Sequence, residues 1–297
     1  MYGYTAYGLT LRSELILPEL IPAHAAPDVT ITLGAVPETL AAPTGRGVWY
    51  QVSPHEFLLN IPDTARYLAA NGSTVTIERA PDAPDALVRL YLLGSVLAAI
   101  LHQRGALPLH GSAINTPRGA VIFCGPSGRG KSTLAWEFQR RGYQHMCDDI
   151  SVIGFDAHSK PLVYPAYPQL NLWADVLEKH PPPRDVVRAL HPELQKYALP
   201  TRAAFDAAPT PLFALYYLQT TNTDTLTLEP IKGLDKLQIL VANTYRARWI
   251  AAMAKRTLHF QTAAHAGQSI RTRRVTRPLS PFRLHELADL IERDLAA

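Results

Sequence analysis

The 297-residue sequence predicts an α/β domain preceded by a smaller β-rich domain. Short β-type runs separated by Pro and Gly fill the first 80 residues and are typical of strands. A continuous apolar run over residues 119–124 is typical of a strand buried on both faces. It leads directly into a Gly-rich turn and a helix, as in the strand–helix–strand units of α/β domains. We therefore assign residues 1–80 to the β-rich domain and residues 81–297 to the α/β domain.

The predicted strands of the first domain are short. The clearest hairpin joins residues 65–69 to residues 74–78 through Asn71-Gly72, a pair that supplies the two positive φ angles of a type I′ turn. This half has no cluster of titratable residues with an obvious chemical role. We therefore interpret it as a domain with a supporting or recognition role and not a catalytic one. Its other strands are expected at residues 9–13, 29–33, 48–52 and 56–61.

The second domain begins with a helix. An acidic, Pro-containing stretch before an apolar run is a helix-start signal, and it predicts a buried helix over residues 85–103. The Gly-rich turn after residue 124 leads into a helix over residues 131–141. The remaining elements are expected as strands at residues 150–155, 213–218 and 225–229 and as helices at residues 233–241, 244–255 and 281–295.

The composition fits a folded protein, with 47% hydrophobic and 18% charged residues. The two cysteines, Cys124 and Cys147, rule out a disulfide scaffold and form no CxxC metal pattern, so the predicted compartment is a reducing cytoplasm. The chain begins without a signal-peptide pattern. Its longest apolar stretch, residues 87–101, falls short of the roughly 20 residues of a membrane span. We therefore expect no membrane partner.

A phosphate-loop motif carries the strongest chemical signal in the sequence. Residues 125–132 read Gly-Pro-Ser-Gly-Arg-Gly-Lys-Ser and match G-x-x-x-x-G-K-[ST] at every defined position. The glycines let successive N–H groups point inward, and the helix N-terminus adds its positive end. Lys131 would reach the β- and γ-phosphates, and Ser132 would ligate Mg²⁺. The nucleotide is expected to contact Gly125, Pro126, Ser127, Gly128, Arg129, Gly130, Lys131, Ser132 and Thr133.

Two carboxylates and a histidine extend this candidate site. Asp148 and Asp149 open an apolar strand, so we expect them beside the phosphate loop at the edge of the same sheet. One carboxylate of such a pair can bind Mg²⁺ while the other accepts a proton from an attacking hydroxyl. The alternative is a surface turn with solvated acids. His110 precedes the phosphate-loop strand and could form a dyad with Asp148, although a lone histidine is more often structural.

These motifs together resemble the HPr kinase/phosphorylase superfamily. The resemblance rests on Leu109-His110-Gly111, the loop at residues 125–132, Arg141-Gly142-Tyr143 and Asp148-Asp149. Those enzymes phosphorylate a protein serine with a phosphate-loop fold related to phosphoenolpyruvate carboxykinase. The resemblance implies that Asp148 is the base, polarised by His110, that Asp149 assists Mg²⁺ and that Lys131 bridges the phosphates. The assignment of the two aspartates to these roles is left open.

The whole chain resembles the HPr-kinase-like proteins encoded beside natural-product and lasso-peptide biosynthesis genes. The segments that carry this likeness are residues 8–15, 102–110 and 167–173. Some members of that group phosphorylate a serine at the C-terminus of a precursor peptide. The resemblance therefore implies ATP and Mg²⁺ as cofactors and a peptide or small protein as acceptor, and homo-oligomerisation is a further expectation.

The basic charge is concentrated near the C-terminus. From residue 244 onward there are ten Arg or Lys against four Asp or Glu, while the whole chain has a net charge of +4. Arg246, Arg248, Arg274 and Arg277 are therefore candidates for binding an acceptor or the γ-phosphate, and the alternative is a solvated basic face. Nucleic-acid binding is not expected, because no aromatic interleaving accompanies these charges.

Two other functions are compatible with a phosphate loop. One is a small-molecule hydroxyl kinase, and the other is a nucleotide-sensing module without phosphoryl transfer. The retention of His110, Asp148 and Asp149 favours catalysis over sensing. Tyr167, Pro168 and Trp173 are interpreted as core packing, with an acceptor or adenine pocket as the alternative.

Overall fold

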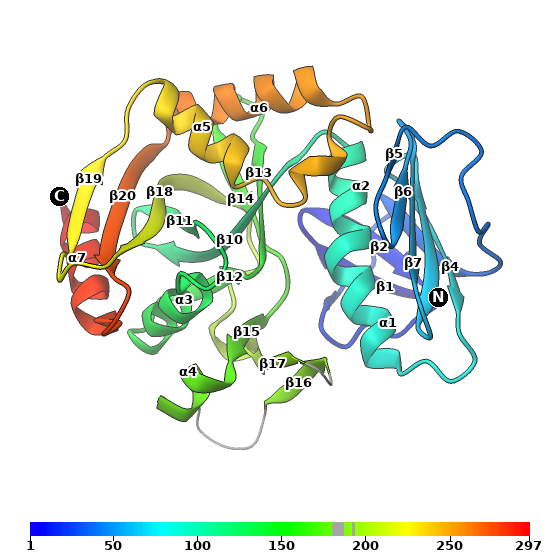
Figure 1. The fold of residues 1–297 in the computed structure, drawn as a ribbon, viewed down its shortest axis with the longest axis horizontal. Coiled ribbons are helices and arrows are strands. Elements are labelled where there is room, and N and C mark those ends of the chain that lie inside the picture. The colour runs from blue at the N-terminus through cyan, green and yellow to red at the C-terminus, as the bar shows by residue number, and fades with distance from the viewer. Residues whose placement is uncertain (180–186, 192–193) are drawn as a thin grey trace. The chain divides into compact units, whose positions relative to one another are not determined.

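The computed structural model describes residues 1–179, 187–191 and 194–297 and has a mixed α/β architecture with three sheets (Figure 1). The predicted α/β class is confirmed. Contacts divide the chain into two compact units. The first unit comprises Met1–Pro108 and Tyr245–Thr262, and the second comprises Leu109–Thr244 and Ala263–Ala297. This division differs from the predicted boundary at residue 80, because the helix that follows packs on the first sheet and a later segment joins the same unit.

A nine-stranded sheet forms the body of the first unit, in the order β3-β1-β2-β4-β9-β8-β7-β6-β5. Its strands alternate between buried and half-buried residues, as in β8, where every second side chain enters the core. The strands are β1 (Tyr2–Ala6), β2 (Leu9–Ser13), β3 (Ile21–Pro22), β4 (Val29–Leu33), β5 (Gly45–Arg46), β6 (Tyr50–Val52), β7 (Glu56–Ile61), β8 (Ala65–Ala70) and β9 (Thr74–Arg79).

The predicted β8–β9 hairpin is present, with a longer loop than expected. Asn71 and Gly72 have the positive φ angles of 54° and 67° that the sequence predicts. Ala70, however, pairs with Thr74, so the loop has three residues instead of two. The hairpin turn therefore keeps its predicted backbone conformation and extends the loop by Ser73.

The helical stretch over residues 85–103 is buried, as predicted, but it packs on this sheet and not in the predicted second domain. The Tyr67 hydroxyl donates a hydrogen bond to the Val88 carbonyl, and the Gln103 amide donates to the Ala69 carbonyl. By length and composition alone, residues 85–103 could cross a membrane, but most of the stretch is buried inside the unit, as in a core helix. The stretch comprises α1 (Asp85–Tyr91), a π-helical turn (Leu92–Val96) and α2 (Leu97–Gln103).

The helix predicted over residues 244–255 is wrong. Arg246 has a left-handed φ of 55°, which interrupts any helix there, and only a short 3₁₀ turn forms at Ala247–Trp249. The Trp249 side chain is instead buried against Phe57, with ring centroids 4.4 Å apart. A helix that the sequence analysis missed, α6, follows at Arg256–Ser269.

The main sheet of the second unit runs in the order β11-β10-β13-β14-β18-β20-β19, with β12 also paired to β10. Because β18 pairs with both β14 and β11, the first five of these strands close on themselves. The strands are β10 (Leu107–Thr116), β11 (Gly119–Cys124), β12 (Gln144–Cys147), β13 (Ile150–Phe155), β14 (Pro161–Tyr164), β18 (Thr210–Thr221), β19 (Thr227–Pro230) and β20 (Arg271–Pro278).

A third, small sheet in the second unit has the order β15-β17-β16. Its central strand pairs with β15 in an antiparallel register in which Asn171 faces Ala198 and Trp173 faces Lys196. The strands are β15 (Gln169–Trp173), β16 (Arg188–His191) and β17 (Leu194–Pro200).

Helices α3 and α7 pack together against the main sheet of the second unit (Figure 1). In α7 the buried residues recur every three or four positions, the period of an amphipathic helix. They share one core with side chains of α3, such as Leu134 and Phe138, and with Phe123 of β11. The helices of this unit are α3 (Lys131–Arg140), α4 (Ala174–Lys179), α5 (Leu234–Ala242) and α7 (Leu284–Ala296).

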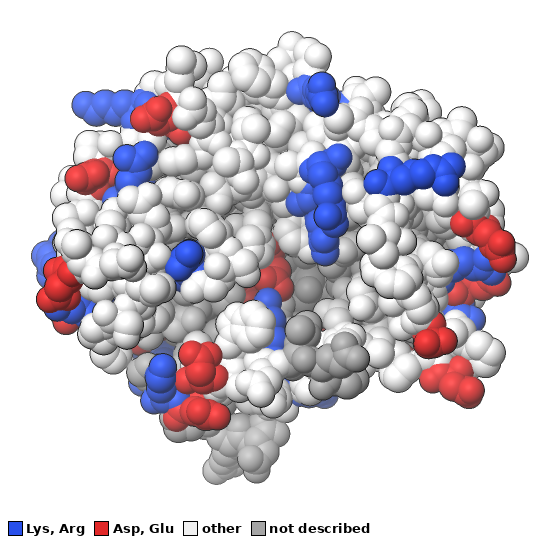
Figure 2. Space-filling view, in the orientation of Figure 1, with Lys and Arg blue, Asp and Glu red and all other residues white. Residues whose placement is uncertain are grey.

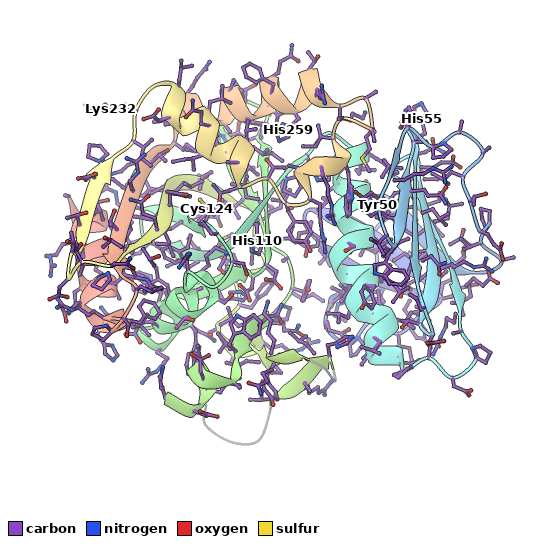
Figure 3. The ribbon with its side chains drawn as sticks, in the orientation of Figure 1. Tyr50, His55, His110, Cys124, Lys232 and His259 are labelled. Carbon is purple, nitrogen blue, oxygen red and sulfur yellow. The ribbon has the colours of Figure 1, made fainter. Side chains whose placement is uncertain are left out.

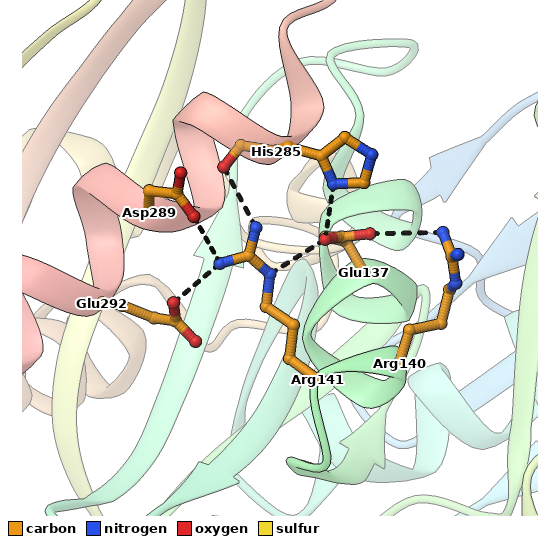
Figure 4. A network of polar contacts seen from close by, with 6 residues as sticks. All are labelled: Glu137, Arg140, Arg141, His285, Asp289 and Glu292. Carbon is orange, nitrogen blue, oxygen red and sulfur yellow. Dashed lines mark hydrogen bonds and ion pairs between the residues drawn. The ribbon is translucent and has the colours of Figure 1, made fainter.

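A charged network joins the end of α3 to α7 (Figure 4). The Arg141 guanidinium lies 2.9 Å from Glu137 and 2.7 Å from both Asp289 and Glu292, and it donates to the His285 carbonyl. The Glu137 side chain is only 4% exposed. Burying a carboxylate without a cation lowers the free energy of unfolding, so the fold needs Arg141 beside Glu137.

We expect Arg141→Met to lower the free energy of unfolding by about 2 kcal/mol, because it leaves Glu137 buried without its main cation. Arg140→Met is the matched control. Arg140 contacts the same carboxylate at 3.5 Å from an exposed position, so its loss should cost under about 0.5 kcal/mol. Urea unfolding of both variants measures the difference, and equal effects would refute the importance of the α3–α7 network.

The buried His102 side chain should make the fold less stable in acid. His102 of α2 is 3% exposed, with Nε2 2.8 Å from the Tyr245 carbonyl, and burial lowers its pKa to about 4. The unfolded chain, with an ordinary histidine pKa near 6.5, binds this proton more readily. The contribution of neutral His102 to the free energy of unfolding is therefore fully present above pH 6.5. It falls by about 1.4 kcal/mol per pH unit as the pH drops toward 4.

Unfolding free energies measured at several pH values between 7 and 4 check this slope. In His102→Gln the amide can still donate to the Tyr245 carbonyl but does not titrate, so the pH dependence should become shallower. An unchanged slope in this variant would show that His102 is not the group responsible.

Candidate active site

The loop between β11 and α3 has a backbone that only glycine tolerates at two points. Gly125 has a φ of 138°, and a Cβ there would lie 2.4 Å from the Leu218 carbonyl oxygen. Gly130 has a φ of 90°, and its Cβ would meet the Phe282 ring at 2.8 Å. Within the described part of the chain no side-chain cap is found at the start of α3, so its first N–H groups can bind another acceptor. This geometry suits the anion-binding role predicted for the motif.

Lys131 is enclosed by its own loop. Its ammonium group donates hydrogen bonds to the carbonyls of Gly125 and Pro126 at 2.9 and 3.0 Å. Burial lowers the pKa of Lys131, and the charges of Asp149 and Asp148 oppose that shift. The lysine also lines the cavity described below, as does Asp149.

Asp148 is held by donors from three separate elements, and its residue is only 4% exposed. One carboxylate oxygen accepts hydrogen bonds from Ser112 of β10 at 2.5 Å and from Ser132 of α3 at 2.8 Å. The other oxygen accepts the backbone N–H of Asn171 in β15 at 2.7 Å. The carboxylate therefore connects the helix of the phosphate-loop motif to both sheets of the second unit.

Asp149 is oriented differently from its neighbour. Its φ of 62° is left-handed, and its side chain is 34% exposed and lines the cavity. Both carboxylate oxygens lie 3.1 Å from the Lys196 ammonium, and one also accepts the Asn171 side-chain amide at 3.0 Å. Asp149 is thus the carboxylate that a molecule in the cavity can reach.

The surroundings separate the two aspartates in acidity. Burial, followed by the charge of Asp149, raises the pKa of Asp148 above its usual range. Burial would also raise the pKa of Asp149, but Lys196 together with the charge of His110 and the Asn171 amide lowers it below the usual value. Two neighbouring carboxylates repel one another when both are ionised, and Lys196 is the cation that keeps the pKa of Asp149 low in spite of this.

The sequence predicted that His110 pairs with Asp148, whereas in the structure it contacts Asp149. Its Nδ1 lies 3.1 Å from the backbone carbonyl of Asp149, whereas the Asp148 carboxylate is bound by the three donors named above. Burial and then the charge of Lys131 lower the pKa of His110. In Figure 3 His110 lies close to Cys124, because the next residue, Gly111, pairs with that cysteine across β10 and β11.

A cavity of about 150 Å³ brings most of the predicted site residues together. Asp148 forms no part of its lining and lies behind Ser132, through which it connects to the cavity. The lining combines the loop, Asp149 and the small third sheet. The predicted residues in the lining are His110, Ser127, Gly128, Gly130, Lys131, Ser132, Thr133, Asp149 and Arg277.

The C-terminal arginines separate into different places. Arg246 and Arg248 lie in the first unit, where they stack on Trp249 and Tyr50, respectively, and neither belongs to the described lining of the cavity. Arg274 also lies outside that lining. Arg277 lines the cavity, but its guanidinium is buried, stacks on a phenylalanine ring and donates to the Arg129 carbonyl at 3.0 Å. Arg277 thus contacts the phosphate loop through the Arg129 carbonyl.

Figure 2 shows one face of the molecule, on which charged side chains lie among larger uncharged areas. On this face the Lys and Arg side chains lie in small separate groups, several of them beside Asp or Glu.

Sequence reasoning assigned no role to three residues of the site. Ser112 follows His110 by two positions on one strand, a spacing that places both on the same side of β10. Asn171 and Lys196 reach Asp149 through strand pairing of the third sheet, which has no local sequence signal. Trp173, interpreted as core packing, is instead 43% exposed and lines the cavity.

The residues present suit Mg²⁺ bound together with a nucleotide. In phosphate-loop proteins the motif Ser/Thr and an acidic residue hold the ion jointly, and Ser132 and Asp148 are in direct contact. Among the described residues, no group of three or more His, Cys, Asp or Glu side chains could hold a metal. Mg²⁺ usually takes only one or two carboxylates and completes its shell with water and phosphate oxygens.

No protein-family model and no curated protein matches this chain. Among solved structures, the chain is similar to the HPr(Ser) kinase/phosphatase from Coxiella burnetii, with 11% sequence identity and a TM-score of 0.35. The matched region covers 64% of this chain and 90% of that protein. A likeness of this size assigns neither a fold family nor an activity, so the function rests on the site geometry.

Proposed function

We propose that the protein is an ATP- and Mg²⁺-dependent phosphotransferase that phosphorylates a serine hydroxyl of a peptide or small protein in the cytoplasm. One observation carries the proposal. Asp148 is bound to the motif residue Ser132, while its neighbour Asp149 faces the same cavity with a separate set of partners. Phosphoryl transfer to a hydroxyl needs these two carboxylate functions, one beside the metal and one beside the acceptor.

The residues of the site have different roles in this mechanism. The N–H groups at the start of α3 and Lys131 bind the phosphates of ATP. Ser132 and Asp148 would hold Mg²⁺, which when bound neutralises charge on the phosphate oxygens. This assignment reverses the order implied by the family resemblance, in which Asp148 is the base. It follows from burial, because Asp148 has no lining surface in the cavity and Asp149 does.

Asp149 accepts the proton of the acceptor hydroxyl in this mechanism. Lys196 and the Asn171 amide hold its carboxylate in one orientation, so a hydroxyl entering the cavity meets a fixed acceptor. His110 contacts the backbone carbonyl of Asp149 and supports the left-handed conformation that turns this side chain toward the cavity. Orientation of this kind accounts for a large part of the rate advantage in phosphoryl transfer.

The isosteric variants Asp149→Asn and Asp148→Asn separate the two roles. Asp149→Asn should leave the Kd of Mg·ATP within about threefold of wild type and lower phosphoryl transfer by roughly 10²- to 10⁴-fold, because general-base catalysis is lost. Asp148→Asn should weaken ATP binding only when Mg²⁺ is present. Calorimetric titration with and without Mg²⁺ and single-turnover assays with radiolabelled ATP measure these effects.

Asp175→Asn serves as the control, because Asp175 lines the same cavity from α4 and its side chain is 67% exposed. It should change neither quantity. Transfer at a near wild-type rate in Asp149→Asn would contradict the assignment of the base, and an ATP affinity unaffected by Asp148→Asn in the presence of Mg²⁺ would contradict the assignment of the metal ligand.

The acceptor we propose is the C-terminal serine of a lasso precursor peptide, on the basis of the family resemblance in the sequence. Incubation with radiolabelled ATP and a precursor peptide that ends in serine should label that peptide, and the Ser→Ala form of the same peptide should stay unlabelled. Mass spectrometry should locate the phosphate on the terminal residue. Labelling of small hydroxyl compounds in preference to the peptide would support a metabolite kinase, and ATP binding without any labelled acceptor would support a nucleotide sensor.

A further inference from the structure

One face of the third sheet is directed at Asp149. Trp173 of β15 pairs directly with Lys196 of β17, and Asn171 lies two residues before Trp173. Residues that pair directly, or that lie two apart on one strand, share a face of a sheet. Asn171, Trp173 and Lys196 are therefore on one face, which we call the acceptor face. Two of its three side chains bind the Asp149 carboxylate, and all three line the cavity.

Trp173 contributes an accessible aromatic surface to this face. Its side chain is 43% exposed, and the Lys196 ammonium lies 6.0 Å from its ring centroid. A single exposed tryptophan is ordinary on a protein surface. Trp173, however, lies beside the proposed base, and tryptophan provides a large contact area and is enriched where partners bind. It is therefore a candidate surface for binding the acceptor.

Lys196 differs from the other Lys and Arg residues described in the cavity lining. Lys131 donates to two carbonyls of the phosphate loop, and Arg277 donates to the Arg129 carbonyl and to its own neighbour's carbonyl. Both of these cations therefore belong to the phosphate side of the site. Lys196 instead contacts Asp149 and comes from the third sheet, so it belongs to the side that an acceptor must approach.

We propose that the acceptor face binds the phosphoryl acceptor and selects one that carries an acidic group close to its hydroxyl. This inference rests on the proposed function. The acceptor hydroxyl must hydrogen-bond to Asp149, so it competes with Lys196 for the same carboxylate oxygens. A second carboxylate on the acceptor then gives the displaced ammonium a partner, with a charge-assisted hydrogen bond. Trp173 packs against the adjacent apolar part of the acceptor.

A positional-scanning library of serine peptides tests this selectivity. One half of the library ends in a free carboxylate and the other half in an amide, so the two halves distinguish a terminal carboxylate from an Asp or Glu side chain. Wild type should show a kcat/KM at least roughly tenfold higher for peptides with an acidic group next to the serine than for their neutral counterparts. Either source of the carboxylate supports the inference.

Lys196→Met should reduce this preference to within twofold and leave the Kd of Mg·ATP within twofold of wild type. Lys232→Met is the matched control, because Lys232 is exposed and lies well away from His110 in Figure 3, and it should retain the full preference. Trp173→Ala should raise KM for acidic and neutral peptides alike. Trp173→Phe, which keeps an aromatic ring, should restore part of that loss, and a thermal melt checks that both variants fold.

Three outcomes would count against the inference, and they point to different failures. Wild-type labelling without preference for acidic peptides overturns the acceptor face and leaves the proposed function intact. Loss of ATP affinity in Lys196→Met assigns Lys196 to the phosphoryl group, and an equal loss of transfer to acidic and neutral peptides limits its role to orienting Asp149; either result also overturns the inference. If wild type labels no peptide in either half of the library, the proposed function itself is wrong.

Discussion

The buried carboxylate of Asp148 is the contact on which the candidate site depends. It accepts hydrogen bonds from Ser112, Ser132 and the Asn171 backbone, which belong to β10, α3 and β15. An ionised group so deeply buried is tolerated only when its oxygens are fully bound. This requirement fixes the start of α3 and the third sheet relative to the main sheet. The cavity has its shape because these three elements converge on one charge.

The second constraint is that two adjacent aspartates cannot share one environment. The chain resolves this by turning Asp149 into a left-handed conformation, so that it meets Lys196 and the Asn171 amide while Asp148 stays inside. The result is one carboxylate with a raised pKa and one with a lowered pKa. The Arg141 network at the other end of α3 holds this helix against α7 and so supports the same arrangement from a distance.

The parts of the site that lie close together in sequence could be predicted, and the parts brought in by strand pairing could not. The loop, Lys131 and Ser132 follow from a local pattern of glycines before a helix. The contacts of Lys196 and Trp173 depend on the register between β15 and β17, which no short-range signal encodes. Helix periodicity also failed at residue 246, where a left-handed residue and the burial of Trp249 outweigh helix propensity.

A crystal structure with Mn²⁺ and a non-hydrolysable ATP analogue tests the division of labour between the two aspartates most directly, because anomalous scattering locates the metal. We expect Mn²⁺ beside the Ser132 hydroxyl and the Asp148 carboxylate, bound directly or through water, with Asp149 outside the metal shell and still facing the cavity. A metal coordinated by Asp149, with Asp148 retaining only its contacts to Ser112 and Asn171, would contradict it.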